Sequence, residues 1–477
     1  MNKSIRLTAI FGLVLTVILQ VNLTIIHAFS DEKYAHNPLN KRAFYELQTT
    51  PRGQISAGGQ VLAQSTENED GTYSRSYPST SPAFGPVTGY ISEIYGASHL
   101  EHSYNEMLNG TDPALLTSNW LQQLSGKRPD GANLELTLDS QLQQYTYDQF
   151  TNQGFQGAAA AIRPSTGEVL ALTSSPGFDP SGISNTATAE DSWAKVTNTP
   201  GNALLNHATA ETLPPGSIFK IVTTAAGLEA GYNPESPVTG AAEITLPNTE
   251  TQLTNYDAQV CGGSQTVTLR TAFSLSCNTA FVEMGIKAGA DKLREAAEGF
   301  GIGERYDLGV DAASGSLGDL PDDAAIGQSS IGQRDVTMSA LQAAVMAGTV
   351  ANKGERMQPY LVSKITNSEL KTVKETKPTV ASNEVDEATA ETLSSLMRSS
   401  EENTAGYDGN GFHSKTGTAE HGEGLPPHTW YVAFDPAKDI AIAVVVKDGG
   451  NFGEAATGGR VAAPIGRGML REFGGGN

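Results

Sequence analysis

The chain of 477 residues is poor in cysteine and in basic residues. Each shortage argues against some kinds of partner or binding site. Its 31 Lys and Arg residues against 52 Asp and Glu residues give a net charge of −21 at pH 7, which argues against partners such as nucleic acid or an anionic membrane surface. The two cysteines come without a Cys-x-x-Cys or His-Glu-x-x-His pattern. We therefore expect no metal and no cofactor, and the length predicts two or three domains.

The N-terminal residues contain one long apolar run, 7–26, which follows Lys3 and Arg6. Twenty helical residues span about 30 Å, close to the thickness of a bilayer core. A cleaved signal peptide is the alternative, but the run is longer than a usual signal core and no Ala-x-Ala site follows it. We favour a membrane signal anchor in residues 1–30, with a cytoplasmic N-terminus and the remaining chain on the outer side of the cell membrane.

A serine and a lysine lie three residues apart where a turn meets an apolar segment. Pro214 to Gly216 form the turn, Ser217 follows it, and Lys220 begins the apolar residues that continue to Leu228. Residues three apart are neighbours on a helix, so Lys220 can act as a base for the Ser217 hydroxyl. The apolar residues surround the predicted helix, which favours a buried helix with Ser217 at its N-terminal end, where the dipole stabilises negative charge.

The Ser-x-x-Lys spacing alone is a weak signal. It recurs from Ser30, Ser192 and Ser368, but none of these serines opens an apolar helix after a Pro-Gly turn. Two further motifs strengthen the pattern: Ser276-Cys277-Asn278, and then Lys415 to Thr418, which contains the one Lys-Thr-Gly of the chain. Their order within one segment makes a shared active site the better interpretation.

The hydrophobic patterns divide the chain into two regions after the apolar run. Residues 31–153 are irregular and polar in places, with an exposed hairpin or loop at 64–81 and no plausible active site. Residues 154–477 predict an α+β domain whose sheet is completed by its C-terminal part. The predicted strands cover 158–162, 169–172, 414–418, 430–434 and 440–446, the last buried on both faces, and the predicted helices lie near 274–288, 291–300 and 337–351.

With these motifs in order, the chain resembles the penicillin-binding protein and serine β-lactamase superfamily. Further segments similar to its transpeptidase domain are 164–171, 206–208, 327–328, 336–342 and 428–434. Residues 52–63 are similar to the opening of monofunctional, class B members, except that Ser56 to Gly59 replace the usual Asp-Arg-x-Gly. The resemblance covers most of the chain and is closest to the actinobacterial, PbpA-type transpeptidases. It implies an antiparallel sheet with helices, a nucleophile on the active-site helix, and residues 31–153 as an elongated pedestal like the class B dimerisation domain.

The resemblance also implies the chemistry and a role for each motif residue. A peptidoglycan D,D-transpeptidase would form an acyl-enzyme on its serine from D-Ala-D-Ala stem peptides, release D-Ala, pass the acyl group to an acceptor amine, and be acylated by β-lactams. The expected catalytic residues are Ser217, Lys220, Ser276, Asn278 and Lys415, and the expected substrate-binding residues are Thr416, Gly417 and Thr418. The backbone N–H groups of Ser217 and Thr418 would form the oxyanion hole. A desolvated Lys220 would take the serine proton, although the acylation base is disputed across the superfamily.

Other functions use the same residues. A D,D-carboxypeptidase would use water as acceptor. A β-lactamase would need a deacylating base, and no Glu-x-x-Leu-Asn segment lies between Asn278 and Lys415. A β-lactam sensor is disfavoured because only about six residues precede the apolar run. A scaffold for wall synthesis could coexist with the enzyme, and a membrane glycosyltransferase is the expected protein partner.

Cysteines and histidines near the motifs have two interpretations each. Outside the cytoplasm, Cys261 and Cys277 are expected to form a disulfide that tethers the Ser276 loop, and closing about 15 residues contributes about 3 kcal/mol in the chain-entropy model. The alternative is a pair of unrelated buried thiols. His413, His421 and His428 lack metal-ligand spacing, so we assign them to loops or hydrogen-bond networks.

Overall fold

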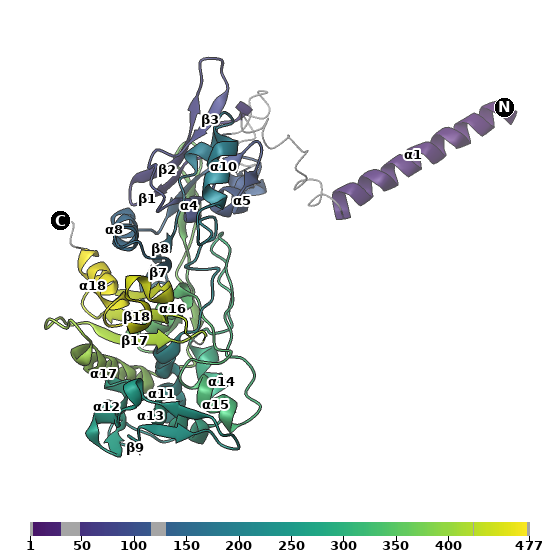
Figure 1. Ribbon diagram of the computed structural model, residues 1–477. Coiled ribbons are helices and arrows are strands. Elements are labelled where there is room, and N and C mark those ends of the chain that lie inside the picture. The colour runs from purple at the N-terminus through teal and green to yellow at the C-terminus, as the bar shows by residue number, and fades with distance from the viewer. Residues whose placement is uncertain (1–2, 30–47, 116–129, 423, 475–477) are drawn as a thin grey trace.

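The computed structural model describes residues 3–29, 48–115, 130–422 and 424–474. Helix α1 (Lys3–Phe29) contains a segment, Lys3–Ile26, with a mean hydropathy of 2.3 and none of it buried. Among the described residues it is the one helix long and apolar enough to cross a membrane (Figure 1). This agrees with the apolar run that the sequence places at the N-terminus.

A five-stranded antiparallel sheet forms the centre of the larger region (Figure 1). Its order is β17 (His413–Ala419), β18 (His428–Asp435), β19 (Ile440–Val446), β7 (Gly157–Ile162) and β8 (Val169–Ser175). Strands from both ends of this region therefore pair side by side, with Val444 of β19 opposite Ala159 of β7. All five predicted strands are confirmed, and so is an α+β domain whose sheet is completed by its C-terminal part.

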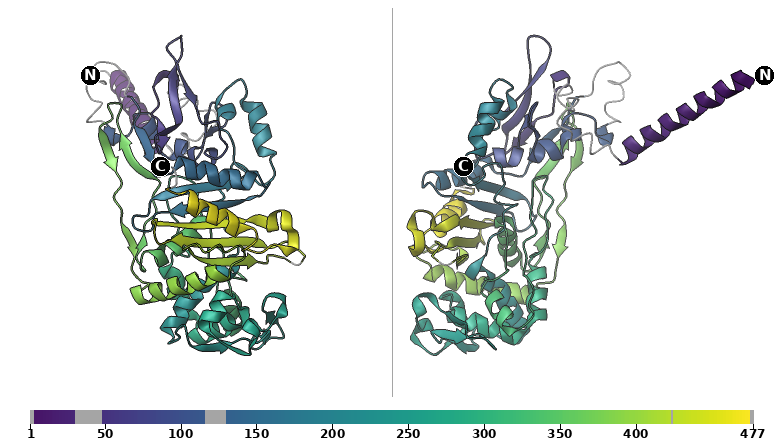
Figure 2. Two further views of the ribbon diagram at one scale, coloured as in Figure 1. Left: turned by 90° about the vertical axis from the view of Figure 1, so that its left-hand side faces the viewer. Right: turned by 45° about the vertical axis from the view of Figure 1, so that its right-hand side comes forward.

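The two faces of the sheet pack against different helices because side chains alternate along a strand. In β19 every residue is buried. Ile442 and Val444 belong to the hydrophobic core on one face of the sheet, and Ala441 and Ala443 belong to the core on the other face. Helices α8 (Ser140–Thr151) and α18 (Ala462–Glu472) lie together over the first face, as the left view of Figure 2 shows. Helix α16 (Ala340–Ala351) covers the second.

Further helices lie on the α16 side of the sheet. They are α11 (Lys220–Glu229), α12 (Leu269–Ser274), α13 (Asn278–Ala288), α14 (Ala290–Gly299), α15 (Asp323–Ser329) and α17 (Glu387–Asn403). Two of them begin with motif residues, α11 with Lys220 and α13 with Asn278. The helix predicted near 274–288 is confirmed over Asn278–Ala288, but its first residues are not helical, because α12 ends at Ser274 and α13 starts at Asn278. Between them Ser276 takes a positive φ of 61°, which no helix accommodates.

A second sheet, of six strands, takes four of its strands from residues 55–136, which precede the Ser217 motif (Figure 1). Its order is β15 (Thr372–Glu375), β14 (Val362–Thr366), β6 (Asn133–Leu136), β1 (Ile55–Ala57), β2 (Gln60–Glu67) and β3 (Tyr73–Ser76). Strands β2 and β3 form the predicted hairpin. Beside them, the buried carboxylate of Glu101 accepts hydrogen bonds from Arg52 Nε and Arg75 Nε, each at 2.6 Å. Strands β14 and β15 come from late in the chain, so this sheet links the two regions.

Shorter elements complete the described chain. They are α4 (Gly85–Thr88), β4 (Ile91–Ser92), β5 (Gly96–Ala97), α5 (His99–Ser103), α6 (Asn105–Leu108), α9 (Ser181–Ser184), α10 (Ala189–Thr197), β9 (Pro237–Thr239), β10 (Glu243–Thr245), β11 (Gln252–Thr254), β12 (Thr266–Thr268), β13 (Arg356–Met357) and β16 (Val380–Ser382).

Candidate active site

Ser217 lies in a 3-10 turn, Gly216–Phe219, that runs directly into α11. Side chains three residues apart eclipse one another in a 3-10 helix, so Ser217 and Lys220 lie on the same side. The predicted α-helix therefore begins at Lys220, one turn later than its first motif residue. The prediction of a buried helix is confirmed, since residues 220–227 are all buried while Ser217 stays partly exposed.

Strand β17 lies directly against the turn that carries Ser217. A Cβ on Gly216, which has a φ of 54°, would lie 2.7 Å from the Thr418 carbonyl oxygen. A Cβ on Gly417 would lie 2.7 Å from the Pro215 carbonyl oxygen. Only glycine allows this approach at either position, because real Cβ contacts are longer. The two glycines thus bring the backbone of the Lys-Thr-Gly strand beside Ser217.

Lys220 is buried and its amine faces the Ser276 loop. The Nζ atom donates to the Ser276 carbonyl at 2.7 Å, to Ser276 Oγ at 3.2 Å and to Asn278 Oδ1 at 2.8 Å. The same Nζ atom lies 5.2 Å from the centre of the Phe281 ring. Burial, with a smaller contribution from the positive charge of Lys415, holds the pKa of Lys220 well below its usual value. An amine with a lowered pKa can be neutral at neutral pH and accept a proton.

Lys415 approaches the same hydroxyl from β17. Its Nζ donates to Ser276 Oγ at 2.8 Å and to the Thr416 carbonyl at 3.0 Å. Burial lowers the pKa of Lys415 to about 7. The Ser276 hydroxyl therefore lies between two lysine amines, and this arrangement allows a proton to pass between Lys220 and a group bound at β17.

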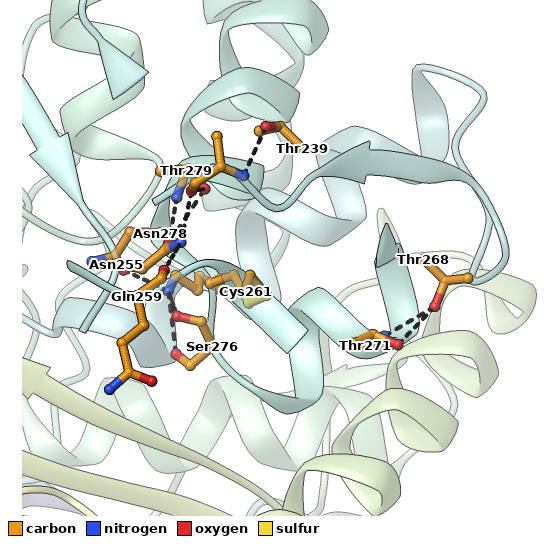
Figure 3. The surroundings of a disulfide bond; sticks show 12 residues. Thr239, Asn255, Gln259, Cys261, Thr268, Thr271, Ser276, Asn278 and Thr279 are labelled. Carbon is orange, nitrogen blue, oxygen red and sulfur yellow. Dashed lines mark hydrogen bonds between the residues drawn. A yellow bond between two sulfur atoms is a disulfide. The ribbon is translucent and has the colours of Figure 1, made fainter. Parts of the chain in front are cut away.

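The Ser276 loop is held from several sides (Figure 3). Asn278 Nδ2 donates to the Thr254 carbonyl at 2.8 Å, and Cys277 N donates to Ala272 O at 2.9 Å. Cys277 is joined to Cys261 by a disulfide, with the two Cα atoms 5.9 Å apart. These bonds fix the loop that carries Ser276, the residue that both lysines contact.

The substrate-binding residues predicted on β17 alternate along the strand. Thr416 and Thr418 are partly exposed, whereas Lys415 and Gly417 are buried. Because β17 is the edge strand of its sheet, its free backbone groups can pair with an extended peptide. Gly458 N also donates to Thr418 Oγ1 at 3.3 Å.

The three histidines separate into two environments. His413 Nδ1 lies 2.9 Å from Ser394 Oγ, away from the other two. The rings of His421 and His428 stack with centroids 3.8 Å apart, and both face the Asp448 carboxylate. The sequence pattern does not identify Asp448, which comes from the 3-10 segment Lys447–Ala455 after β19.

Sequence reasoning also missed Glu401, which supports β17 from α17. Its buried carboxylate accepts hydrogen bonds from Ser414 Oγ at 2.5 Å, Tyr431 OH at 3.0 Å and Arg467 Nε at 2.8 Å. A single glutamate in a polar stretch of sequence gives no sign of burial. Its apolar neighbours at helical spacing, Leu393, Leu396 and Met397, mark the buried face on which it lies.

Residues 157–471 match the family model of the penicillin binding protein transpeptidase domain. The chain belongs to this family. Residues 52–134 also match the penicillin binding protein A dimerisation domain. Both matches agree with the resemblance to class B penicillin-binding proteins that the motifs indicate.

Relatives match along nearly the whole chain. The chain is 41% identical, over 98% of each protein, to the peptidoglycan D,D-transpeptidase PbpA of Mycolicibacterium smegmatis, and 38% identical, over the same share, to PbpA of Mycobacterium tuberculosis. Among solved structures, penicillin-binding protein A from M. tuberculosis as a ceftriaxone acyl-enzyme complex superposes with a TM-score of 0.86 at 39% identity, covering 90% of this chain and 99% of that chain. Its penicillin G acyl-enzyme complex gives a TM-score of 0.84 at 40% identity, covering 89% and 99%.

Proposed function

We propose that the chain is a serine-type peptidoglycan D,D-transpeptidase that cross-links stem peptides and is acylated by β-lactams. The observation that carries this proposal is the position of the Ser276 hydroxyl between the amines of Lys220 and Lys415, beside the turn that bears Ser217. Relatives named peptidoglycan D,D-transpeptidase and solved β-lactam acyl-enzyme complexes of similar sequence support it.

In the first half-reaction, Ser217 Oγ attacks the carbonyl carbon of the penultimate D-alanine. Neutral Lys220 takes the hydroxyl proton, and the amide C–N bond breaks as an ester forms on Ser217. Ser276 passes a proton from Lys220 to the departing amine, and free D-alanine leaves. The backbone N–H groups of Ser217 and Thr418 bind the oxyanion of the tetrahedral intermediate.

The second half-reaction reverses these roles. An acceptor amine attacks the ester carbonyl, its proton passes to Lys220, and Ser217 regains a proton as the new amide forms. Before the first half-reaction, Lys415 attracts the terminal carboxylate of the intact donor peptide, with the Thr416 and Thr418 hydroxyls as its hydrogen-bond donors. Gly417 leaves room for the peptide along the edge of β17.

The chain organisation extends this proposal. We infer that residues 1–30 anchor the protein in the cell membrane with the N-terminus in the cytoplasm, that residues 31–153 form a pedestal, and that residues 154–477 form the extracytoplasmic transpeptidase domain. The apolar helix α1 supports the anchor. We further propose a membrane glycosyltransferase as the partner that supplies glycan strands. A reporter enzyme active only outside the cytoplasm, fused after residue 477, tests the orientation and must be active.

Labelling with a fluorescent penicillin tests the nucleophile. Wild-type protein is expected to take the label and Ser217→Ala to take none. Ser368→Ala is the matched control, because Ser368 and Lys371 have the same spacing in an exposed segment and its labelling should equal wild type. Equal labelling of Ser217→Ala would refute the mechanism. Mass spectrometry with a D-Ala-D-Ala donor and an amine acceptor then separates transfer from hydrolysis.

A further inference from the structure

Two histidines and one aspartate meet at the end of the substrate-binding strand. His428 is the first residue of β18 and pairs with Ala419, the residue directly after Thr418. His421 follows β17 in the segment that leads to β18, and Asp448 lies in the 3-10 segment after β19. Three separate parts of the chain therefore place potential ligands at one point, which the proposed transpeptidase mechanism does not use.

The donor atoms are spaced as the ligands of one small ion. His421 Nε2 lies 3.1 Å from Asp448 Oδ1, and His428 Nδ1 lies 3.6 Å from the same oxygen. The three ligand atoms all lie within 4.8 Å of one another. Two ligands of a tetrahedral zinc ion, with bonds of about 2.0–2.2 Å, are about 3.3–3.6 Å apart. The separations of 3.1 and 3.6 Å between the histidine nitrogens and Asp448 Oδ1 are close to this range.

The backbone orients the donors before any ion binds. Asp448 N donates to His428 Nδ1 at 3.1 Å, so this nitrogen carries a lone pair that points toward the aspartate. An ion bound at Nδ1 takes the place of the Asp448 N–H group as the partner of this lone pair, and the amide keeps its proton. In the metal-free protein His421 Nε2 donates its proton to the Pro426 carbonyl at 2.9 Å, which holds the ring next to His428. An ion bound at this nitrogen displaces that proton to solvent. The rings stack at an interplanar angle of 12°.

The surroundings permit a cation. Lys447 is adjacent in sequence to Asp448, and its ammonium pairs with Glu211 Oε1 at 2.5 Å. That pairing offsets the positive charge beside the cluster. Asp448 is 57% exposed, whereas the His428 side chain is 6% exposed. The cluster is therefore open to solvent on the aspartate side, where water can complete the coordination.

We propose that His421, His428 and Asp448 bind a zinc ion, with water in the fourth position. Two imidazoles and one carboxylate favour zinc and similar late transition ions, whereas magnesium and calcium prefer oxygen ligands. The ion links His421, three residues after the predicted substrate-binding residue Thr418, to the start of β18 and to the segment after β19. It acts there as a structural clamp on the end of the substrate-binding strand.

Zinc binding to the full-length protein tests the proposal directly. The untagged chain, solubilised in detergent and stripped with a chelator, is titrated with ZnCl₂ by calorimetry, and bound zinc is counted by elemental analysis after dialysis. Wild-type protein should hold one more zinc ion per chain than Asp448→Asn or His421→Gln. Each variant should lower the affinity of that site at least tenfold. MgCl₂ should neither bind this site nor displace the zinc.

Matched variants make the result decisive. His102→Gln changes a histidine outside the cluster and should bind zinc as the wild type does. Circular dichroism and fluorescent-penicillin labelling show that each variant is folded. Failure of the wild type to take up zinc, or equal zinc uptake by all three variants, overturns the proposal. Displacement of zinc by equimolar magnesium overturns the donor assignment and the proposal with it.

Discussion

Lys415 Nζ lies 2.8 Å from Ser276 Oγ, so an ammonium on the edge strand contacts a hydroxyl on a loop between two helices. Lys220 contacts the same oxygen at 3.2 Å from the helix that follows Ser217. Three segments distant in sequence thus share one hydroxyl. In the proposed mechanism, this oxygen is the point through which protons move between the base and the leaving amine.

Replacing Ser276 by alanine or by glycine separates its chemical role from its backbone role. Both changes remove the hydroxyl, so both should slow acylation by fluorescent penicillin about 10²–10⁴-fold. The backbone φ of 61° disfavours alanine, so the free energy of unfolding of Ser276→Gly should exceed that of Ser276→Ala by about 1 kcal/mol. Stopped-flow labelling and denaturant unfolding measure the two effects. Normal acylation by Ser276→Gly would contradict the proton relay.

The pH dependence of acylation should be bell-shaped, with one limb assigned to each lysine. Below its lowered pKa, Lys220 is protonated and cannot take the Ser217 proton, so the rate falls toward acid. Above its pKa of about 7, Lys415 loses the charge that attracts the substrate carboxylate, so the rate falls toward alkali. The second-order rate constant for labelling is measured from acid to alkaline pH.

Lys415→Arg is the control for the alkaline limb. An arginine guanidinium keeps its charge throughout the accessible pH range, so the variant should lose the decline above neutral pH even if its maximal rate is lower. The acid limb should remain, because Lys220 is unchanged. An identical alkaline limb in both proteins would assign that limb to another group.

Patterns confined to one segment predicted the structure well. The run 440–446 is apolar at every position, and it forms a strand buried on both faces as expected. The break between α12 and α13 escaped prediction because the left-handed conformation of Ser276 is set by backbone bonds of its loop, among them Cys277 N to Ala272 O. Local propensity alone does not encode such a conformation.

Contacts between distant segments were the least predictable part. Strands β14 and β15 join the six-stranded sheet, where Ile365 of β14 pairs with Leu134 of β6. The residues of neither strand indicate with which other strand it pairs. Asp448 joins His421 and His428 through the register of β18 and β19. The motif residues Ser276 and Lys415 could be predicted as a pair only because their types in this order match a known chemistry.

Removing the disulfide should destabilise the Ser276 loop. The Cys261→Ser, Cys277→Ser double variant loses a link between residues 16 apart, which lowers the free energy of unfolding by about 3 kcal/mol in the chain-entropy model. Penicillin labelling should also slow, because Cys277 directly follows Ser276. Denaturant unfolding and labelling measure these effects. Two freely alkylated thiols in the unreduced protein, seen by intact-mass measurement, would contradict the link itself.

Glu401 should stabilise the protein from behind the substrate-binding strand. Glu401→Gln keeps the size of the side chain but leaves Arg467, which is 3% exposed, without its anionic partner. Breaking a buried ion pair in this way costs about 3–5 kcal/mol, so the denaturant midpoint should fall markedly.

The neighbouring Glu402 provides the matched control for this prediction. Its carboxylate pairs with Arg398 at 3.1 Å, and its side chain is 48% exposed. An exposed pair is worth about 0–1 kcal/mol, so Glu402→Gln should unfold nearly as the wild type does. Glu401 also accepts a hydrogen bond from the hydroxyl of Ser414, the residue before Lys415. Only Glu401→Gln should therefore disturb the strand that carries Lys415 and slow penicillin labelling. Equal midpoints for the two variants would show that the charge of Glu401 does not stabilise the fold.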